Sequence, residues 1–288
     1  KKMREKKTVA AFMYDFDNTL STKDMQEYAF IPSINMDAKD FWAESNMYAK
    51  KYNMDSILAA MYLMTVKSRG TANASRSNLI EQGKTVEFHK GVDSWFDRIN
   101  EFGRANGVEV EHYIISSGIK PIIEGTSIAR HFKQIFACDF VYDESGKPEW
   151  PAIAVNYTSK LQFLYRINKG IWDIWDNKRL NAHMDEEDRP VPFSNMIYVG
   201  DGLTDVPCMK LTRQNGGYSI GVYDPTKEGN RIGNSYLMTD DRVNFYVKAD
   251  YSEGSELEEI AKMILLKIRT ESILERITER HAKSVSNI

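Results

Sequence analysis

The chain has 288 residues, of which 42% are hydrophobic, so it is long enough to bury a substantial core in one large domain or in a domain with an insert. Its formal net charge of -3 argues against a nucleic-acid binder, because such proteins usually carry a strong basic excess. No window reaches the roughly 18 apolar residues of a membrane helix, and two cysteines, Cys138 and Cys208, are too few for a disulfide framework or a zinc site, so we expect a cytoplasmic protein.

The first predicted elements are a leader and a strand. Residues 1–7 form a basic run that we expect to be solvated, since too few apolar residues follow it for a signal peptide. Residues 9–14 form an apolar run that predicts a buried strand, and this strand ends in Asp15-Phe16-Asp17-Asn18-Thr19. Two carboxylates gain nothing from packing there. The stretch is therefore either a plain strand exit or a group of acids gathered for chemistry.

Residues 21–88 contain no obvious strand. The spacing of their apolar residues predicts helices over 38–52 and 55–67. We expect residues 21–88 to form a small helical cap domain, inserted after the first strand into a core made of residues 8–20 and 89–288.

The rest of the chain alternates short apolar runs with helical patterns. The runs occupy 110–115, 134–138, 195–199 and 218–222, and the helical patterns occupy 91–106, 121–132, 161–169 and 204–211. This alternation predicts an α/β fold with a Rossmann-like, doubly wound parallel sheet. A β-hairpin is predicted over 140–155, a surface loop over 176–192 and a closing helix over 256–281.

Polar residues follow several of the predicted strands. Besides the acids after the first strand, Ser116-Ser117-Gly118 follows the second, Thr158-Ser159-Lys160 precedes a helix, and Gly200-Asp201-Gly202-Leu203-Thr204-Asp205 follows the run at 195–199. Ligands of an open parallel sheet bind at the carboxyl ends of its strands, so these segments can converge on one site.

This set of residues suits phosphoryl transfer. Carboxylates at strand ends form a hard, acidic site for Mg²⁺, and a carboxylate can act as a nucleophile that forms an aspartyl-phosphate. Small hydroxyls and glycine amides can hold phosphate oxygens. A lysine can neutralise charge on the group in transfer.

The same residues match the motifs of a known superfamily. Asp15-x-Asp17-x-Thr19, Ser116, Lys160 and Gly200-Asp201-Gly202-x-x-Asp205 resemble, in this order, the four motifs of the haloacid dehalogenase (HAD) superfamily. The second acid, Asp17, resembles the phosphatases rather than the dehalogenases. The helical insert resembles the C1-type cap of the phosphoserine phosphatase-like branch. The resemblance covers roughly residues 8–225, and the cap matches only in position and helical character.

The resemblance implies a Mg²⁺-dependent phosphatase in which Asp15 attacks phosphorus and Asp17 protonates the leaving alcohol, then activates water. The metal ligands would be Asp15, Asp201, the backbone carbonyl of Asp17 and, unless it orients the lysine instead, Asp205. Lys160 would steady the developing charge. The implied phosphate-binding residues are Ser116, Ser117, Gly118, Gly202 and Thr19, which would also tie the loop after the first strand.

Several of these residues have a structural interpretation when taken alone. Ser116 is then a helix cap, and Ser117 is an alternative source of the hydroxyl. Lys160 is a solvated lysine in a first helical turn, and Asp205 is an acid favoured by the helix dipole. Two lesser candidates for the lysine are Lys147 and Lys169.

The predicted cap offers candidates for substrate recognition. By the same resemblance, an acid such as Asp24 or Glu27 would meet a substrate amino group, and Arg69 or Arg76 a substrate carboxylate. Aromatic residues recur in the predicted cap helices, where they either pack the cap, which is the favoured interpretation, or form a box for a quaternary ammonium such as phosphocholine. These aromatic residues are Phe41, Trp42, Tyr48, Tyr52 and Tyr62.

The sequence thus predicts hydrolysis of a small phosphorylated metabolite through an aspartyl-phosphate, with Mg²⁺ as cofactor and with neither nucleic acid nor membrane as partner. Two alternatives remain open. One is a phosphotransferase that passes the phosphoryl group to an alcohol. The other is a non-catalytic protein of the same fold that binds phosphate and metal.

Overall fold

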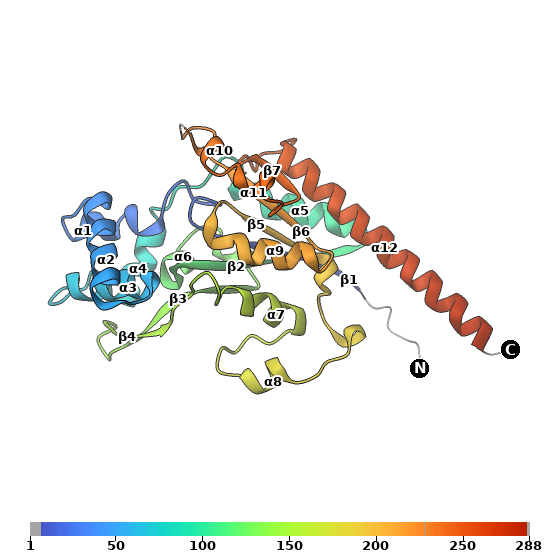
Figure 1. Cartoon of the computed structure of the whole chain (residues 1–288), viewed down its shortest axis with the longest axis horizontal. Coiled ribbons are helices and arrows are strands. Elements are labelled where there is room, and N and C mark those ends of the chain that lie inside the picture. Colours follow the sequence, from blue (N-terminus) through green and yellow to red (C-terminus); the bar gives the residue numbers. More distant parts are fainter. Residues whose placement is uncertain (1–6, 228, 287–288) are drawn as a thin grey trace.

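The structure, a computed structural model, describes residues 7–227 and 229–286. Apart from Lys7, the predicted basic leader lies outside the described residues. A seven-stranded sheet with the order β4-β3-β2-β1-β5-β6-β7 forms the centre of the molecule (Figure 1). Every neighbouring pair is parallel except β3 and β4, which form the predicted hairpin. The predicted α/β fold with a doubly wound sheet is confirmed.

The strand β1 (Thr8–Tyr14) is the middle strand of the sheet. It pairs with β2 (Val108–Ile119) and with β5 (Met196–Gly200), so that Thr8 is opposite Val108 and Ala11 is opposite Met196. The other strands are β3 (Gln134–Tyr142), β4 (Pro148–Ile153), β6 (Tyr218–Tyr223) and β7 (Phe245–Lys248). The sequence analysis missed β7, a four-residue edge strand too short to show a clear pattern.

Helices cover both faces of the sheet (Figure 1). One face carries α5 (Val92–Ala105) and α12 (Glu256–Ser286), and the other carries α7 (Leu161–Lys169) and α9 (Val206–Gln214). The helix α5 buries Val92, Trp95, Phe96 and Ile99, which recur at helical spacing on one stripe. The predicted helices at 91–106 and 161–169 are confirmed, and α12 is longer than predicted.

A group of helices lies between β1 and α5 in the chain, at one end of the molecule (Figure 1). It comprises α1 (Phe30–Ser33), α2 (Ala38–Tyr52), α3 (Ser56–Lys67) and α4 (Arg76–Gly83). Asp37 caps α2 by accepting from the Asp40 N–H, and Asp55 caps α3 by accepting from the N–H groups of Ile57 and Leu58. We call residues 21–88 the cap. The chain enters and leaves it through an antiparallel bridge between Ser21 and Phe88.

One predicted helix, 121–132, is wrong in its length. The helix α6 (Lys120–Glu124) ends at Gly125, and a separate 3-10 turn, η2, covers Ala129–His131. The backbone of Gly125 packs directly against Ile80 of α4, and Gly83 of α4 packs against the backbone of Ile122. A side chain at either glycine would collide with the opposite backbone, so this close approach explains both residues and holds α4 against α6.

The remaining elements are short. The predicted surface loop over 176–192 is mostly exposed, but it contains α8 (Asn177–Asn181), capped by Asp176, and the 3-10 turn η3 (Glu186–Asp188). The others are η1 (Met25–Glu27), η4 (Phe193–Asn195), η5 (Leu203–Asp205), α10 (Asn230–Gly233) and α11 (Tyr236–Thr239). None of the helices within the described ranges has the length and hydropathy needed to cross a bilayer.

Candidate active site

The loop after β1 places two carboxylates at the carboxyl edge of the sheet. The Asp15 N–H still donates to the Val199 carbonyl of β5 at 2.9 Å, so Asp15 is held as an extension of the strand. The chain then turns back tightly, because the Phe16 carbonyl accepts from the N–H groups of Leu20 and Ser21. Asn18 adopts a left-handed conformation (φ 59°), which asparagine tolerates better than most residues.

Three carboxylates, two at strand ends and one in the turn η5, converge on this edge. One oxygen from each of Asp15, Asp201 and Asp205 lies within 4.8 Å of the others. The Lys160 Nζ, at the start of α7, reaches them from the side and lies 3.1 Å from the Asp15 Oδ1 and 2.8 Å from the Asp205 Oδ1. Lys160 is fully buried and Asp15 is only 5% exposed, so these ion pairs are shielded from water. The structure therefore brings together four of the predicted catalytic and metal residues.

Asp205 is the most heavily bonded of the three acids. In addition to Lys160, its carboxylate accepts from the Tyr198 hydroxyl at 2.7 Å and from the Asp201 N–H at 3.2 Å. A side chain at Gly200 would collide with this carboxylate, which explains the glycine. Because so many donors already occupy Asp205, its arrangement favours the predicted role of orienting Lys160 over that of a direct metal ligand.

The acids lie in an environment that opposes their ionisation. Burial, reinforced by the charge of Asp205 and opposed by Lys160, raises the pKa of Asp15 to about 7. Burial and neighbouring carboxylates also raise the pKa values of Asp17 and Asp201 well above the ordinary range. Burial lowers the pKa of Lys160, but Asp15 and Asp205 outweigh it, so the net shift is upward and the ammonium form is stabilised.

The donor set of this cluster fits a divalent cation that prefers oxygen. Asp15 and Asp201 offer hard carboxylate oxygens. The pKa of each is raised first by burial and then by the neighbouring carboxylates, which Lys160 only partly offsets. Mg²⁺ takes one or two carboxylates and leaves its other positions for water and phosphate oxygens. Asp15 and Asp201 are therefore the residues that would hold Mg²⁺, with the Asp17 carbonyl as a third candidate ligand.

The two serines after β2 differ in their surroundings. The Ser116 hydroxyl is fully buried and accepts from the Gly118 N–H at 2.9 Å. The Ser117 Oγ has no hydrogen-bond partner among the described residues, and Ser117 lines the cavity described below. Ser117 is thus the serine whose hydroxyl is available to a phosphate oxygen. A side chain at Gly118 would meet the end of the Met25 side chain of η1, which packs against this glycine.

Two other predicted phosphate ligands occupy different positions. The Thr19 hydroxyl donates to the Asp201 Oδ1 at 3.3 Å, so it orients a carboxylate and ties the loop to β5. Gly202 lines the cavity, and its N–H lies 3.4 Å from the Asp205 carboxylate.

A cavity of about 380 Å³ lies between the strand ends and the cap. Its core side is formed by Asp15, Asp17, Ser117, Lys160 and Asp201. On its cap side lie residues from η1, α2 and α3: Gln26, Trp42, Ser45, Asn46, Ser56, Ile57, Ala60, Met61 and Met64. The Asp17 carboxylate also accepts from the Met25 N–H at 2.8 Å, so the predicted proton donor is held by the chain segment that begins the cap.

The predicted substrate residues do not all reach this cavity. Asp24 lines it. Glu27 lies outside the lining, and its carboxylate accepts from the Trp42 indole N–H at 2.9 Å. Arg69 is exposed in the turn after α3 and does not line the cavity, and Arg76 pairs with Glu124 at 2.6 Å instead.

The five aromatic residues of the cap do not gather around the cavity. Trp42 alone among them lines it. Tyr48 packs against Tyr52 and Tyr62, and Phe41 is fully buried against Phe30. The arrangement is that of cap packing, the interpretation favoured from the sequence.

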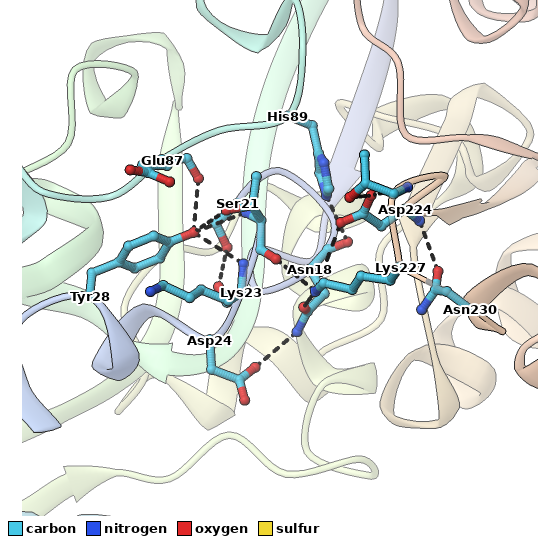
Figure 2. Close-up of polar contacts among 12 residues, drawn as sticks. Asn18, Ser21, Lys23, Asp24, Tyr28, Glu87, His89, Asp224, Lys227 and Asn230 are labelled. Atoms are coloured by element: carbon cyan, nitrogen blue, oxygen red, sulfur yellow. Dashed lines mark hydrogen bonds and ion pairs between the residues drawn. The ribbon is translucent and has the colours of Figure 1, made fainter. Parts of the chain in front are cut away.

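Figure 2 shows a polar network that braces the loop after β1. The Lys227 Nζ, from the loop after β6, donates to the Asn18 Oδ1 and to the Thr22 carbonyl, each at 2.7 Å. The Asn18 Nδ2 in turn donates to the Asp24 Oδ1 at 3.0 Å. Lys227 thereby connects the far side of the sheet with an acid that lines the cavity.

A second part of the network joins the two chain segments that enter and leave the cap (Figure 2). The Tyr28 hydroxyl accepts from the N–H groups of Thr22 and Lys23 and donates to the Glu87 carbonyl at 3.0 Å. Sequence reasoning did not find Lys227, Tyr28 or Tyr198, since none of them lies in a recognisable motif. The only available signal was Asn18, because asparagine is favoured where a tight turn needs a left-handed residue.

Comparison with known proteins agrees with this geometry. Residues 12–210 match the family model of haloacid dehalogenase-like hydrolases. The chain belongs to this family. It also shares 25% identity over 283 residues with an uncharacterised protein of Borreliella burgdorferi, a similarity that covers 88% of this chain and 96% of the relative.

Solved structures of this HAD-like hydrolase's fold include a HAD family hydrolase from Salmonella enterica serovar Typhi, with a TM-score of 0.56 and 14% identity over 87% of this chain and 72% of that one. A phosphoserine phosphatase in the form of a phospho-aspartyl intermediate analogue gives a TM-score of 0.55 and 14% identity over 89% and 99% of the two chains. A substrate-bound phosphoserine phosphatase gives 0.53 and 13% identity, covering 91% and 99%. These similarities show a shared fold.

Proposed function

We propose that this HAD-like hydrolase is a Mg²⁺-dependent phosphatase that hydrolyses a small phosphomonoester through an aspartyl-phosphate on Asp15. The observation that supports this most directly is the buried arrangement of Asp15, Lys160 and Asp205 beside a cavity that also contains Asp17. Mg²⁺ at Asp15 and Asp201 would supply positive charge for the phosphate oxygens and for the carboxylate that attacks them.

In the first half of the reaction, an Asp15 carboxylate oxygen attacks phosphorus, an O–P bond to Asp15 forms, and the bond to the ester oxygen breaks. Asp17 donates its proton to the leaving alkoxide. Burial and the nearby carboxylates of Asp24 and Asp15 keep the pKa of Asp17 high, which suits a group that must start protonated. Lys160 and the Ser117 hydroxyl hold oxygens of the phosphoryl group.

In the second half, water attacks phosphorus and Asp17 accepts its proton. The bond between phosphorus and Asp15 breaks, and the carboxylate is restored as inorganic phosphate leaves. Met25 holds Asp17 throughout, through the N–H bond at 2.8 Å. The cap wall excludes bulk water from the phosphoenzyme.

The deciding experiment measures hydrolysis of p-nitrophenyl phosphate, with and without Mg²⁺, by the native chain and by Asp15→Asn. We expect Mg²⁺-dependent turnover that falls at least ~100-fold in the variant. The matched control is Asp40→Asn, an exposed acid on α2 outside the cavity, which should retain activity. Turnover that survives in Asp15→Asn would contradict the assignment of Asp15 as the nucleophile.

Two rival functions give different results. A phosphotransferase would convert an added acceptor alcohol such as glycerol into its phosphate ester, which product analysis detects. A non-catalytic binding protein would bind Mg²⁺ and inorganic phosphate but turn over no ester.

A further inference from the structure

The charge of the cavity distinguishes between classes of phosphomonoester. Among the described residues that line it, Lys160 is the sole cation, and its ammonium group is already held by Asp15 and Asp205. The cap side carries amide, hydroxyl, thioether and hydrocarbon groups, and no basic side chain. The part of the substrate that faces the cap therefore meets no positive charge.

Several cations of the cap and its surroundings have other partners. The Lys67 Nζ lies 2.8 Å from Glu44, Arg76 pairs with Glu124, and the Lys23 Nζ lies over the Tyr28 ring. The Lys227 Nζ is linked to Asp24 through the Asn18 side chain, but it donates to Asn18 and to the Thr22 carbonyl, and Lys227 lies outside the lining. None of these groups is placed to receive an anion in the cavity.

Asp24 adds negative charge at the same place. It lines the cavity on the cap side, with one carboxylate oxygen held by the Asn18 side chain. Gln26, buried beside it, has an Oε1 without a donor among the described residues. An amide can donate as well as accept, but it has no charge with which to stabilise a carboxylate. An anion bound here would lose its hydration and be repelled by Asp24.

We propose that the natural substrate is a phosphomonoester whose leaving alcohol carries an ammonium group toward Asp24 and has neither a carboxylate nor a second phosphate. This inference rests on the proposed function. The proposal excludes phosphoserine as the natural substrate of this chain, although phosphoserine phosphatases share its fold. The ammonium group gains a carboxylate partner in Asp24, and its carbon chain packs against Met61 and Ile57.

The test compares two esters that differ by a single carboxylate. O-phosphoethanolamine and O-phosphoserine are supplied to the native chain with Mg²⁺, and kcat/KM is measured for each. We expect the value for phosphoethanolamine to be at least tenfold higher. Equal values, or a preference for phosphoserine, would overturn the proposal.

Variants show whether the cap sets this preference. Asp24→Asn should move the ratio of the two kcat/KM values toward one, whereas the exposed control Asp40→Asn should leave the ratio as it is. Ile57→Lys introduces a cation into the lining and should move the ratio toward phosphoserine, so it tests the proposal even where Asp24→Asn fails to fold. A ratio that neither variant changes would overturn the role of the cap charge.

A binding measurement separates failure of this inference from failure of the proposed function. If the native chain hydrolyses neither of the two esters nor p-nitrophenyl phosphate, the proposed function is contradicted. Calorimetric titration of Asp15→Asn with each of the two esters tests the charge preference without turnover. Tighter binding of phosphoethanolamine supports the proposal, and equal or tighter binding of phosphoserine overturns it.

Discussion

The two sides of the cavity are built on different principles. On the core side, Asp15, Asp201 and Lys160 extend from strands or begin a helix, and each is tied by ion pairs or hydrogen bonds to another charged or polar group. On the cap side, Trp42, Met61 and their neighbours supply shape and apolar surface from short helices. Charged groups that must act on phosphorus require fixed positions, whereas a wall that selects the leaving group needs only to fit it.

This difference predicts where substitutions are tolerated. Removal of a core-side group leaves a buried partner without its counter-charge, so the loss reaches both folding and catalysis. Substitution on the cap side changes volume or a single hydrogen bond, so it should alter substrate choice more than the fold.

The largest effect is expected for Lys160→Met. The substitution leaves the carboxylates of Asp15 and Asp205 buried without their cation, and it should lower the free energy of unfolding by about 3–5 kcal/mol. Urea unfolding in the absence of Mg²⁺ measures this loss. Lys210→Met, an exposed lysine on α9, is the matched control and should change stability by less than about 0.5 kcal/mol. If the Lys160→Met protein is as stable as the control, the core side of the cavity does not depend on its ion pairs, and the contrast with the cap side fails.

A second effect belongs to the core behind β1. The His112 Nε2 donates to the Asn100 Oδ1 at 2.9 Å, and the His112 Nδ1 is hydrogen-bonded to the Tyr14 hydroxyl at 3.0 Å. Burial, with a smaller contribution from His131, lowers the pKa of His112 to about 3. Below pH 6.5 the His112 imidazole therefore takes up a proton in the unfolded chain but stays neutral in the folded protein. The free energy of unfolding should fall by about 2 kcal/mol between pH 7 and pH 5 from this group alone.

The variant His112→Gln isolates this contribution. It should show a flatter decline of stability between pH 7 and pH 5 than the native chain, whatever its stability at neutral pH. His183→Gln, an exposed histidine in the loop after α8, should keep the native slope. A native slope in His112→Gln would show that other groups control the acid sensitivity of the core.

The smallest effect is expected on the cap side. Trp42→Phe keeps an aromatic ring in the cavity wall but removes the N–H that donates to Glu27. We expect a loss of about 1 kcal/mol in unfolding free energy and a change of KM that exceeds the change of kcat. A fall in kcat as large as the ~100-fold loss expected for Asp15→Asn would mean that the cap positions the reacting groups, which contradicts this division between the two sides of the cavity.

The same division explains what could be predicted from the sequence. The core side of the site depends on short motifs at strand ends. Asp15, Asp17 and Asp201 were therefore found from their place after predicted strands and from the resemblance of these segments to the HAD motifs, and the parallel sheet brings them together. Lys160 followed from its place at the start of a helix. The structure puts all four in the cavity lining.

What was missed depends on contacts between distant segments. Lys227 reaches Asn18 from more than 200 residues away, and Tyr198 points at Asp205 from within an apolar run that reads only as a strand. The choice between Ser116 and Ser117 depends on which hydroxyl is used by the local backbone. Gly125 ends α6 because α4 packs against it, which no helical periodicity can indicate.

The central place of β1 in the sheet has a consequence for how the protein folds. Its neighbours begin 100 residues later, at Val108, and 185 residues later, where Met196 pairs with Ala11. Contacts between such distant segments slow folding, because long loops must close before the strands can pair. The cap helices α2 and α3, by contrast, are neighbours in sequence and can pack early. During synthesis, about two-thirds of the chain must therefore be made before β1, which leads into Asp15, can pair along both of its edges.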